Sequence, residues 1–397
     1  MEKIIHPRLL AGSLRAVPSK SQAHRFLILA AFSDGPTQIF CDVRNRDMDA
    51  TADCLRALGA GITYEGSRYE VTPISEIPEK AELFCGESAS TLRFLMPVAG
   101  ALGVNATFHM EGRLPRRPIG PLREELERMG CSLSRTDDST VHCCGRLRPG
   151  AYSIRADMTS QFVTGLLLGL SLLDGESTLT LTEKIESLPY IHMTAAAMRR
   201  FGGACPFEGD TFRISPAHFH STGHIHVEGD WSNGAFWLAA KMLGSNLRIT
   251  GLDKASAQGD REVLRHLVGL EEFRVIDCAD IPDLVPILAV VAAAQKGARF
   301  INAGRLRLKE SDRLESTANL IRSLGGSAEI SEDSLLVDGT GLTGGTVDAC
   351  GDHRIAMSAA IAATVCQEPV KIIGAESVEK SYPDFWTDYK RLGGLVR

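Results

Sequence analysis

The chain has 397 residues, of which 44% are hydrophobic and 23% are charged, as in soluble globular proteins long enough for two or more domains. Its net charge of −6 and 6% aromatic content exclude a general nucleic-acid surface, which is usually basic and interleaves aromatic with cationic residues. The longest apolar runs, 162–173 and 284–294, are shorter than the roughly 20 residues that span a bilayer, and residues 1–16 lack the apolar core of a signal peptide. We therefore expect a cytoplasmic protein whose scattered cysteines stay reduced.

One sequence pattern returns about every 70 residues along the chain, which indicates repeated structural units. Each copy starts with polar residues and continues as an Ala/Leu-rich helix, a glycine-containing turn and a strand. The six polar starts lie at residues 20–25, 86–93, 158–161, 230–233, 280–283 and 351–354.

The second half of each copy is a helix that stops at glycine, the usual residue after a helix C-terminus. These helix ends lie at residues 54–61, 125–132, 197–204, 320–327 and 389–396, with a degenerate copy at 263–270. Two alternating runs that predict a β-hairpin follow the first three ends and the end at 320–327. Helices thus alternate with strands, which predicts an α/β fold of two domains with three units each and a seam near 227–230.

Cations stand at the first polar start, where Lys20, Ser21 and Arg25 open an apolar helix. A helix N-terminus already carries positive partial charge and free N–H groups, so cations there cost stability unless an anion is bound. If the repeats bring the polar starts around one cleft, these groups converge on a polyanionic ligand. The alternative is that Ser19 or Ser21 caps the helix and the cations point into water.

Seven motifs occur in a fixed order: "PSKSQAHR", "RRPIG", "TSQF", "SLPYI", "LKESDR", "GDHR" and "EKSYPDF". With them, residues 12–391 resemble the 5-enolpyruvylshikimate-3-phosphate synthase family. The resemblance implies an inside-out α/β barrel in each of two three-repeat domains, with a cleft between them, and domains of residues 1–19 with 229–397 and of residues 20–228. It also implies a monomeric enzyme of the shikimate pathway, and hence of aromatic amino acid biosynthesis. Such an enzyme needs no cofactor or metal and transfers the enolpyruvyl group of phosphoenolpyruvate to the 5-hydroxyl of shikimate 3-phosphate, releasing phosphate.

The resemblance also assigns site residues, position by position. Those matching shikimate 3-phosphate ligands are Lys20, Ser21, Arg25, Thr159, Ser160, Gln161, Ser187, Tyr190, Asp283, Arg305 and Lys309. Those matching the phosphoenolpyruvate pocket are Lys20, Ala89, Arg117, Gln161, Arg313, Arg354 and Lys380. The catalytic candidates are Asp283, Glu310, Lys20, Lys380 and His353. Paired carboxylates with lysine neighbours can remove and deliver protons. We expect Asp283 to take the hydroxyl proton, and Glu310 with Lys20 or Lys380 to handle the methylene proton.

Three positions depart from the family pattern. Arg305 replaces an asparagine that touches shikimate 3-phosphate, so this contact is altered or lost. Glu87 replaces a common asparagine, and Ala89 replaces a glycine beside phosphoenolpyruvate and the inhibitor glyphosate. The added methyl group predicts low glyphosate sensitivity, because overpacking disfavours the longer ligand.

Several alternatives stay open for single residues. Asp283 could be an N-cap, Glu310 and Arg313 an exposed i,i+3 ion pair, and His353 a satisfied buried histidine. The histidine-rich residues 218–226 could bind a metal, but no carboxylate or second-shell pattern accompanies them.

Three other functions compete with the main interpretation. A sister enolpyruvyl transferase acts on UDP-N-acetylglucosamine but places a cysteine in the loop that is 111–120 here, which has none. A non-catalytic anion-binding homologue would not need Asp283, Glu310, Lys20 and Lys380 together. An RNA-binding or RNA-end-processing protein built from related repeats fits poorly with the acidic composition.

Overall fold

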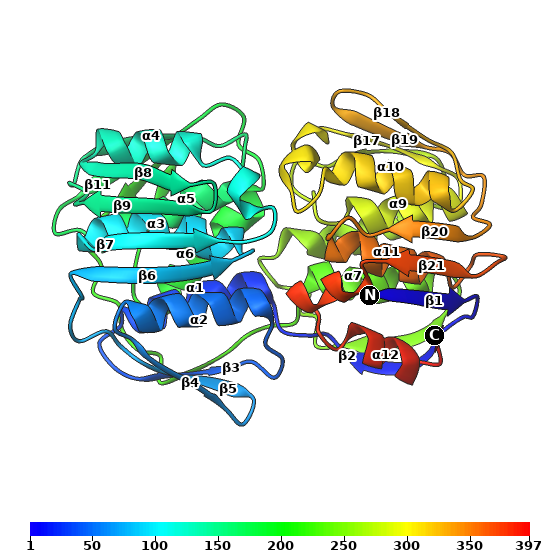
Figure 1. The fold of residues 1–397 in the computed structure, drawn as a ribbon, viewed down its shortest axis with the longest axis horizontal. Helices are drawn as coiled ribbons and strands as arrows, with labels where there is room; N and C mark the ends of the chain where they lie inside the picture. The colour runs from blue at the N-terminus through cyan, green and yellow to red at the C-terminus, as the bar shows by residue number, and fades with distance from the viewer. The chain divides into compact units, whose positions relative to one another are not determined.

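A computed structural model describes residues 1–397 and contains two compact units (Figure 1). Unit 1 comprises Met1–Val17 and Glu228–Arg397, and unit 2 comprises Pro18–Val227. The strands form six separate open sheets, one for each sequence repeat. The fold is therefore α/β with repeated helix and strand units, as predicted. The expected inside-out barrel is not a closed barrel of strands, because each repeat pairs its strands only within its own sheet.

Unit 2 contains three four-stranded sheets of the same topology. In each sheet the first two strands are parallel, and a β-hairpin adds two antiparallel strands beside the second. The strand orders are β14 (His224–His226), β3 (Thr37–Phe40), β5 (Arg68–Thr72), β4 (Gly61–Glu65); β6 (Lys80–Gly86), β7 (Asn105–Met110), β9 (Thr140–Gly145), β8 (Cys131–Asp137); and β10 (Ala151–Arg155), β11 (Ser177–Thr182), β13 (Thr211–Ile214), β12 (Phe207–Glu208).

The helices of unit 2 fall into two classes by burial. The first helix of each repeat is buried on nearly all sides; these are α1 (Lys20–Ala31), α3 (Ala89–Leu102) and α5 (Ser160–Leu170). The second helix buries a smaller share of its residues; these are α2 (Arg46–Ala57), α4 (Gly120–Arg128) and α6 (Leu188–Arg200), with the 3₁₀ turn η1 (Leu114–Arg116) before α4. Helices α3 and α5 pack closely because of Gly165, where a Cβ would lie 2.1 Å from the Arg93 carbonyl oxygen.

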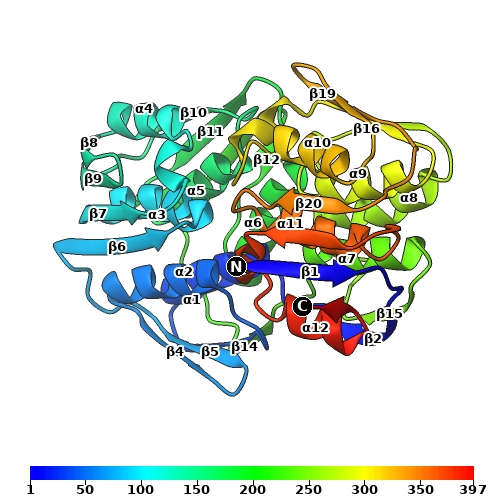
Figure 2. The same ribbon diagram turned by 45° about the vertical axis from the view of Figure 1, so that its right-hand side comes forward.

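Unit 1 repeats this plan with one incomplete copy. The strand orders are β15 (Asn246–Thr250), β2 (Ala11–Arg15); β16 (Arg274–Asp277), β17 (Ala298–Ile301), β19 (Ser334–Val337), β18 (Ala328–Ile330); and β20 (Gly345–Asp348), β21 (Val370–Ile373), β1 (Glu2–His6), β22 (Leu395–Val396). The two-stranded sheet belongs to the copy whose helix end is degenerate in sequence. Strands β20, β21 and β1 run side by side in both views (Figure 1, Figure 2).

In unit 1 the first helices of the three repeats pack against one another; they are α7 (Trp231–Met242), α9 (Val285–Ala294) and α11 (His353–Ala362). The remaining helices are α8 (Val263–Gly269), α10 (Arg313–Ser323) and α12 (Phe385–Arg391), with 3₁₀ turns η2 (Gly259–Glu262), η3 (Gly304–Leu308) and η4 (Ala375–Lys380). Aromatic rings link the third repeat to α7, since Trp237 stacks on Phe385 with ring centroids 5.1 Å apart.

The six polar starts lie at or just before the N-termini of the first helices of the six repeats, which are α1, α3, α5, α7, α9 and α11. Four of these six helices have a side-chain cap: Ser88 for α3, Thr159 for α5, Asp230 for α7 and Asp352 for α11. Ser19 precedes α1 but makes no capping hydrogen bond with its side chain.

The structure also places the features that sequence alone left open. The histidine-rich stretch supplies β14, where the ring of His226 stacks on Phe40 at 4.5 Å, and His220 contacts Asp34 at 2.7 Å. No group of three or more His, Cys, Asp or Glu side chains is arranged to hold a metal ion. All ten cysteines are free thiols, and Cys144 and Cys350 are the exposed ones. None of the helices combines the length and apolar character needed to cross a membrane.

Candidate active-site residues

Helix α1 of unit 2 begins with Lys20, whose ammonium group contacts Asp47 at 2.8 Å. The Lys20 side chain is 15% exposed and that of Asp47 7%, so this cation does not simply point into water. The alternative in which Ser19 caps the helix and the cation is solvated is wrong for Lys20.

Arg25, one turn further along α1, is buried and donates to neutral oxygens. Its Nε donates to the Thr194 hydroxyl at 2.8 Å, and its Nη2 donates to the Thr164 hydroxyl at 3.2 Å and the Tyr190 carbonyl oxygen at 3.1 Å. Burial lowers the pKa of Arg25 to about 9. Its charge is thus held among hydroxyl and carbonyl dipoles at the N-terminal half of α1.

Arg25 also contacts the segment that carries the predicted site residues Ser187 and Tyr190. Its Nη2 bond to Tyr190 reaches the first turn of α6, which follows Ser187. Ser187 is buried and has a left-handed backbone, with φ of 56°, a conformation that costs energy for a residue with a side chain. Ser21 lies beside Lys20 in α1, and its carbonyl oxygen accepts from Arg25 Nη1.

The start of α5 carries the predicted hydroxyl and amide groups. Thr159 caps the helix by accepting from the Gln161 backbone N–H at 3.3 Å, and Ser160 is the first helical residue. The Gln161 side chain accepts from Arg93 Nη1 at 2.7 Å and donates to the Ser90 hydroxyl at 2.9 Å. The amide therefore ties α5 to the start of α3.

Sequence reasoning missed Arg93 as an individual site residue. It is 2% exposed, its guanidinium lies 5.1 Å from the centroid of the Phe162 ring, and its Nη2 donates to the Pro118 carbonyl oxygen at 2.8 Å. Pro118 follows Arg117 directly, so Arg93 anchors the segment that carries a predicted phosphoenolpyruvate ligand. An arginine inside an otherwise apolar helix is the signal that could have identified it, since buried arginines are rare without partners.

The segment at the start of α3 holds two of the three departures from the family pattern. Ala89 is the first residue of α3 and is 4% exposed. The Glu87 carboxylate packs against Gly112, where a Cβ would lie 1.6 Å from Glu87 Oε1. Glu87 therefore contacts the loop that leads through η1 to Arg117.

A series of hydrogen bonds between uncharged side chains connects helices α1, α2 and α3 near the start of α3. His24 Nδ1 lies 2.6 Å from the Thr51 hydroxyl, which lies 2.7 Å from the Thr91 hydroxyl. Thr91 in turn donates to the hydroxyl of Ser88, the cap of α3, at 2.8 Å. Burial lowers the pKa of His24 to about 3, so the ring is neutral and the chain carries no charge.

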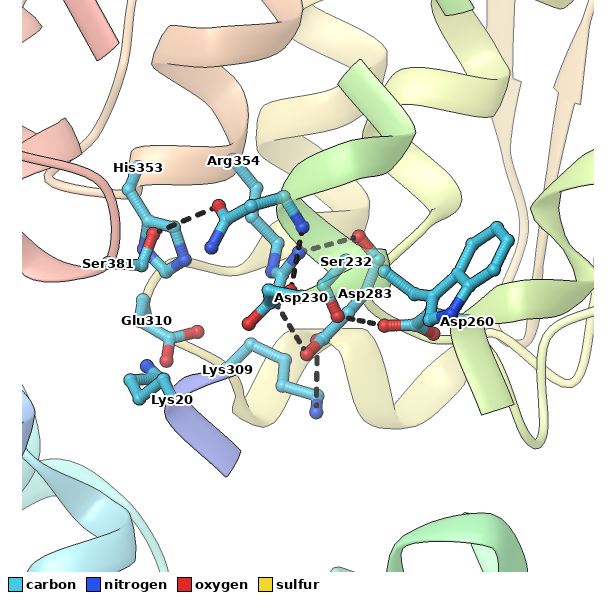
Figure 3. A network of polar contacts seen from close by, with 12 residues as sticks. Lys20, Asp230, Ser232, Asp260, Asp283, Lys309, Glu310, His353, Arg354 and Ser381 are labelled. Carbon is cyan, nitrogen blue, oxygen red and sulfur yellow. Dashed lines mark hydrogen bonds and ion pairs between the residues drawn. The ribbon is translucent and has the colours of Figure 1, made fainter. Parts of the chain in front are cut away.

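In unit 1, Asp283 is the centre of a cluster of cations (Figure 3). Its carboxylate accepts from Arg313 Nη1 at 2.7 Å. It also accepts from Arg354 Nη2 at 2.9 Å, and Lys309 Nζ lies 3.5 Å away. Burial by itself would raise the pKa of Asp283, but Arg354, Lys309 and Arg313 hold it well below its usual range. The N-cap alternative is wrong, because Leu284 is the cap residue of α9 and makes no side-chain cap.

Arg313 joins three carboxylates. Besides Asp283, it contacts Glu310 through Nη2 and Asp352 through Nε at 2.9 Å. Arg313 is 1% exposed and Glu310 14%, so the alternative of an exposed ion pair is wrong. Burial would lower the pKa of Arg313, but Asp352 and Glu310 hold it above its usual range. Asp352, which sequence reasoning did not single out, also caps α11 by accepting from the Arg354 N–H at 3.0 Å.

The other predicted residues of unit 1 lie on adjoining segments. Burial lowers the pKa of Lys309 to about 8, against the opposing effect of Asp283. The Arg305 guanidinium donates to the Ala279 carbonyl oxygen, in the segment before α9. His353 is the first residue of α11 and is 1% exposed. Lys380 ends η4, and the Ser381 hydroxyl beside it lies 3.4 Å from the Asn233 side-chain oxygen (Figure 3).

The two sets of groups differ in what they can do chemically. Unit 2 presents Lys20, Arg25 and Arg93 beside hydroxyl and amide groups, an arrangement that suits phosphate and carboxylate oxygens. Unit 1 presents Asp283 and Glu310 on the same arginine, which suits proton removal and delivery.

Known proteins resemble the chain over its full length. A model of the family described as EPSP synthase (3-phosphoshikimate 1-carboxyvinyltransferase) matches residues 5–389. Curated relatives with the name 3-phosphoshikimate 1-carboxyvinyltransferase include those of Clostridium kluyveri, 38% identical, and Clostridium acetobutylicum, 36% identical, each over 99% of this chain and 97% of the relative.

Solved structures share the fold at lower identity. An EPSP synthase from Acinetobacter baumannii superimposes with a TM-score of 0.82 at 22% identity, over 100% of this chain and 99% of the other. The enolpyruvyl transferase NikO from Streptomyces tendae gives 0.76 at 19% identity, over 100% and 98%.

Proposed function

Because this chain belongs to the EPSP synthase (3-phosphoshikimate 1-carboxyvinyltransferase) family, we propose that it transfers the enolpyruvyl group of phosphoenolpyruvate to the 5-hydroxyl of shikimate 3-phosphate and releases phosphate. The observation that carries the proposal is the Asp283 cluster, which joins two carboxylates through Arg313 beside Lys309 and Arg354. Units 1 and 2 are the two domains of this enzyme in the proposal.

In this proposal unit 2 supplies most of the shikimate 3-phosphate ligands, and Asp283, Arg305 and Lys309 of unit 1 complete the set. The hydroxyls of Thr159 and Ser160 and the free N–H groups at the start of α5 suit the 3-phosphate. Lys20 and Arg25 on α1 and Tyr190 on α6 contact the rest of the substrate. Two polyanions cannot approach one another at low dielectric without such cations.

Unit 1 supplies the acid and base groups. In the addition step, Asp283 accepts the 5-hydroxyl proton while the oxygen bonds to C2 of phosphoenolpyruvate, and a proton from Glu310 or a lysine reaches the methylene carbon. In the elimination step, the new methyl group loses a proton, the C–O bond to phosphate breaks, and the double bond re-forms. Asp283 is a stronger base once substrate anions draw Arg313 and Arg354 away from it, because its low pKa depends on those cations.

Phosphoenolpyruvate carries a carboxylate and a phosphate, and arginine can grip either in two places. The proposed ligands are Arg117, Gln161 and Lys20 from unit 2, with Arg313, Arg354 and Lys380 from unit 1. We further propose that the enzyme acts in the cytoplasm as a monomer and needs neither cofactor nor metal.

The rival acceptor UDP-N-acetylglucosamine is disfavoured by the names of the relatives, and by the absence of cysteine from residues 111–120. Both observations favour the shikimate acceptor.

The test is to mix purified protein with phosphoenolpyruvate and shikimate 3-phosphate and to follow phosphate release. UDP-N-acetylglucosamine serves as the control acceptor. Release with the shikimate compound alone is expected, and no release with it would overturn the proposal.

A further inference from the structure

The sheet of the degenerate repeat in unit 1 lacks the hairpin that completes every other sheet. In the five other sheets an antiparallel strand lies beside the second strand, as β5 lies beside β3 and β19 beside β17. In the sixth sheet β15 has only the parallel strand β2 beside it. Figure 2 shows β2 and β15 together at the margin of unit 1. One edge of β15 therefore has no strand next to it.

The backbone hydrogen bonds of β15 show which of its groups face the open edge. The Asn246 N–H donates to the Leu10 carbonyl oxygen at 2.9 Å, and the Thr250 carbonyl oxygen accepts from the Ala16 N–H at 2.8 Å. These two residues thus direct their backbone groups toward β2. Neighbouring residues of a strand direct their backbone groups to opposite edges. The N–H and C=O of Ile249 therefore point to the open edge, where they can pair with an added strand.

The opposite edge of this two-stranded sheet is covered by the protein itself. The Ala11 N–H of β2 donates to the Leu392 carbonyl oxygen at 2.9 Å, and the Ser13 carbonyl oxygen accepts from Arg391 Nη1 at 2.9 Å. The end of α12 thus closes the β2 side. The β15 side is the edge that remains open to another chain.

Two exposed cations lie beside the open edge. Arg248 is on β15 and Lys241 is in the last turn of α7, and both line a hollow of about 580 Å³ together with Gly12, Ser13 and residues 246–249. Neither cation has an ion-pair partner within the protein. No Asp or Glu lines this hollow, although the chain as a whole has a net charge of −6. The local charge therefore favours an acidic occupant.

We propose that the open edge of β15 is a docking site for an extended acidic segment of a partner protein, which adds to the sheet as the hairpin does in the other repeats. In this mode of recognition main-chain hydrogen bonds supply affinity and side chains supply specificity. The carboxylates of the segment pair with Arg248 and Lys241. The surface lies apart from the proposed active-site residues, so the inference does not rest on the proposed function.

A second copy of this chain is a poorer occupant than an acidic segment. Antiparallel pairing of β15 with itself brings Arg248 and Lys241 of both copies to one seam, and like charges on paired strands are destabilising. Charge complementarity thus selects a different, acidic partner.

The probe for the test is a fluorescent peptide of about six residues, the usual strand length, in which Glu alternates with Val and both ends are blocked. Fluorescence anisotropy measures its binding to the full-length protein. A peptide with Lys in place of Glu tests the role of charge, and an acidic peptide with methylated backbone nitrogens tests the role of strand pairing. Hydrogen exchange with and without the probe locates the site.

Three variants accompany the wild type. Arg248→Glu reverses the charge beside the open edge. Arg299→Glu makes the same change at an exposed position of β17, the second strand of the next sheet, whose edge is covered by β19. Ile249→Pro removes an N–H group from the open edge, where proline is tolerated in strands. None of these residues belongs to the proposed active site, so turnover should be unchanged and serves as a check of folding.

We expect the wild type to bind the acidic peptide about tenfold more tightly than the lysine peptide, the scale of two exposed ion pairs. Arg248→Glu should abolish or reverse this preference, and Arg299→Glu should keep it. Ile249→Pro and methylation of the peptide should each abolish binding. The acidic peptide should slow amide exchange in residues 246–250 and not in residues 298–301.

Equal effects of Arg248→Glu and Arg299→Glu would overturn the inference, as would undiminished binding of the methylated peptide. If Ile249→Pro fails to fold, the methylated peptide decides whether strand pairing is involved. No binding of the acidic peptide by the wild type would also overturn the inference, and would leave the two cations as protection of the edge against aggregation. A wild-type dimer that protects residues 246–250 would overturn it in favour of a second copy.

Discussion

Units 1 and 2 hold their buried arginines in opposite ways. In unit 2, Arg25 donates to hydroxyl and carbonyl oxygens, and burial lowers its pKa to about 9. In unit 1, Arg313 donates to three carboxylates, which hold its pKa above the usual range despite burial. A cation surrounded by uncharged dipoles can still attract an anionic ligand. A cation bonded to carboxylates instead holds those acid and base groups in position. The comparison indicates that unit 2 is built for binding and unit 1 for proton transfer.

The sharpest way to separate the two roles is Asp283→Asn. We expect turnover to fall by about 10²-fold or more, the usual scale for a lost general base, while shikimate 3-phosphate binding persists because unit 2 provides it. Calorimetry and initial rates on one preparation measure both quantities. Near-normal turnover would remove Asp283 from the mechanism and break the division between the units.

A change in unit 2 should alter binding without altering chemistry. Ala89→Gly removes a buried methyl group at the start of α3, and relief of overpacking by about 1–3 kcal/mol corresponds to roughly 5- to 150-fold tighter glyphosate binding. The KM for the shorter phosphoenolpyruvate should change less. The measurement is glyphosate inhibition, competitive with phosphoenolpyruvate, in the two proteins side by side. Equal inhibition constants would show that the methyl group does not set the response.

Lys309 tests whether unit 1 also contributes to binding. Burial lowers its pKa to about 8, so the side chain is cationic below pH 8 and loses its charge as the pH rises through 8. If only the cation binds the substrate, the KM for shikimate 3-phosphate should rise by about tenfold from pH 7 to 9. Lys309→Arg keeps the charge over this range and should flatten the profile. The exposed Lys254→Arg is the matched control, and a wild-type KM that is constant to pH 9 would count against the assignment.

The smallest effect should come from the hydrogen bonds between the uncharged side chains of His24, Thr51 and Thr91. Thr51→Val removes the hydroxyl between His24 and Thr91 and should lower the free energy of unfolding by about 1–3 kcal/mol, because buried polar groups lose their partners. Turnover should be unchanged, since Thr51 touches no proposed ligand. Chemical denaturation of this variant beside Thr178→Val, at an exposed strand position, makes the measurement. A similar loss of unfolding free energy in both variants would mean that the hydrogen bonds of Thr51 to His24 and Thr91 do not stabilise the fold.

The sequence repeat predicted the helices and hairpins well, because helix ends at glycine and alternating strands are local signals. The degenerate copy at 263–270 was visible in the sequence, and its repeat has the two-stranded sheet. Partners were harder to predict. Nothing local showed that Arg313 would join Asp283 to Asp352, because Asp352 belongs to the next repeat and the contact depends on tertiary packing. Asp283 misled as a possible N-cap, because it precedes an apolar helix yet stands one residue too early.

The strand β1 determines when unit 1 can be completed during synthesis. Glu2 pairs with Ile373, and Ile5 pairs with both Val370 and Val396, so β1 has no strand neighbours until β21 and β22 have been synthesised. Unit 2 needs nothing beyond β14, which pairs with β3 through residues 224–226. Domains generally fold as units while the chain is still being made. Unit 2 should therefore be folded on the nascent chain before β1 has a pairing partner. A chain stalled before β21 would expose an unpaired strand edge to aggregation.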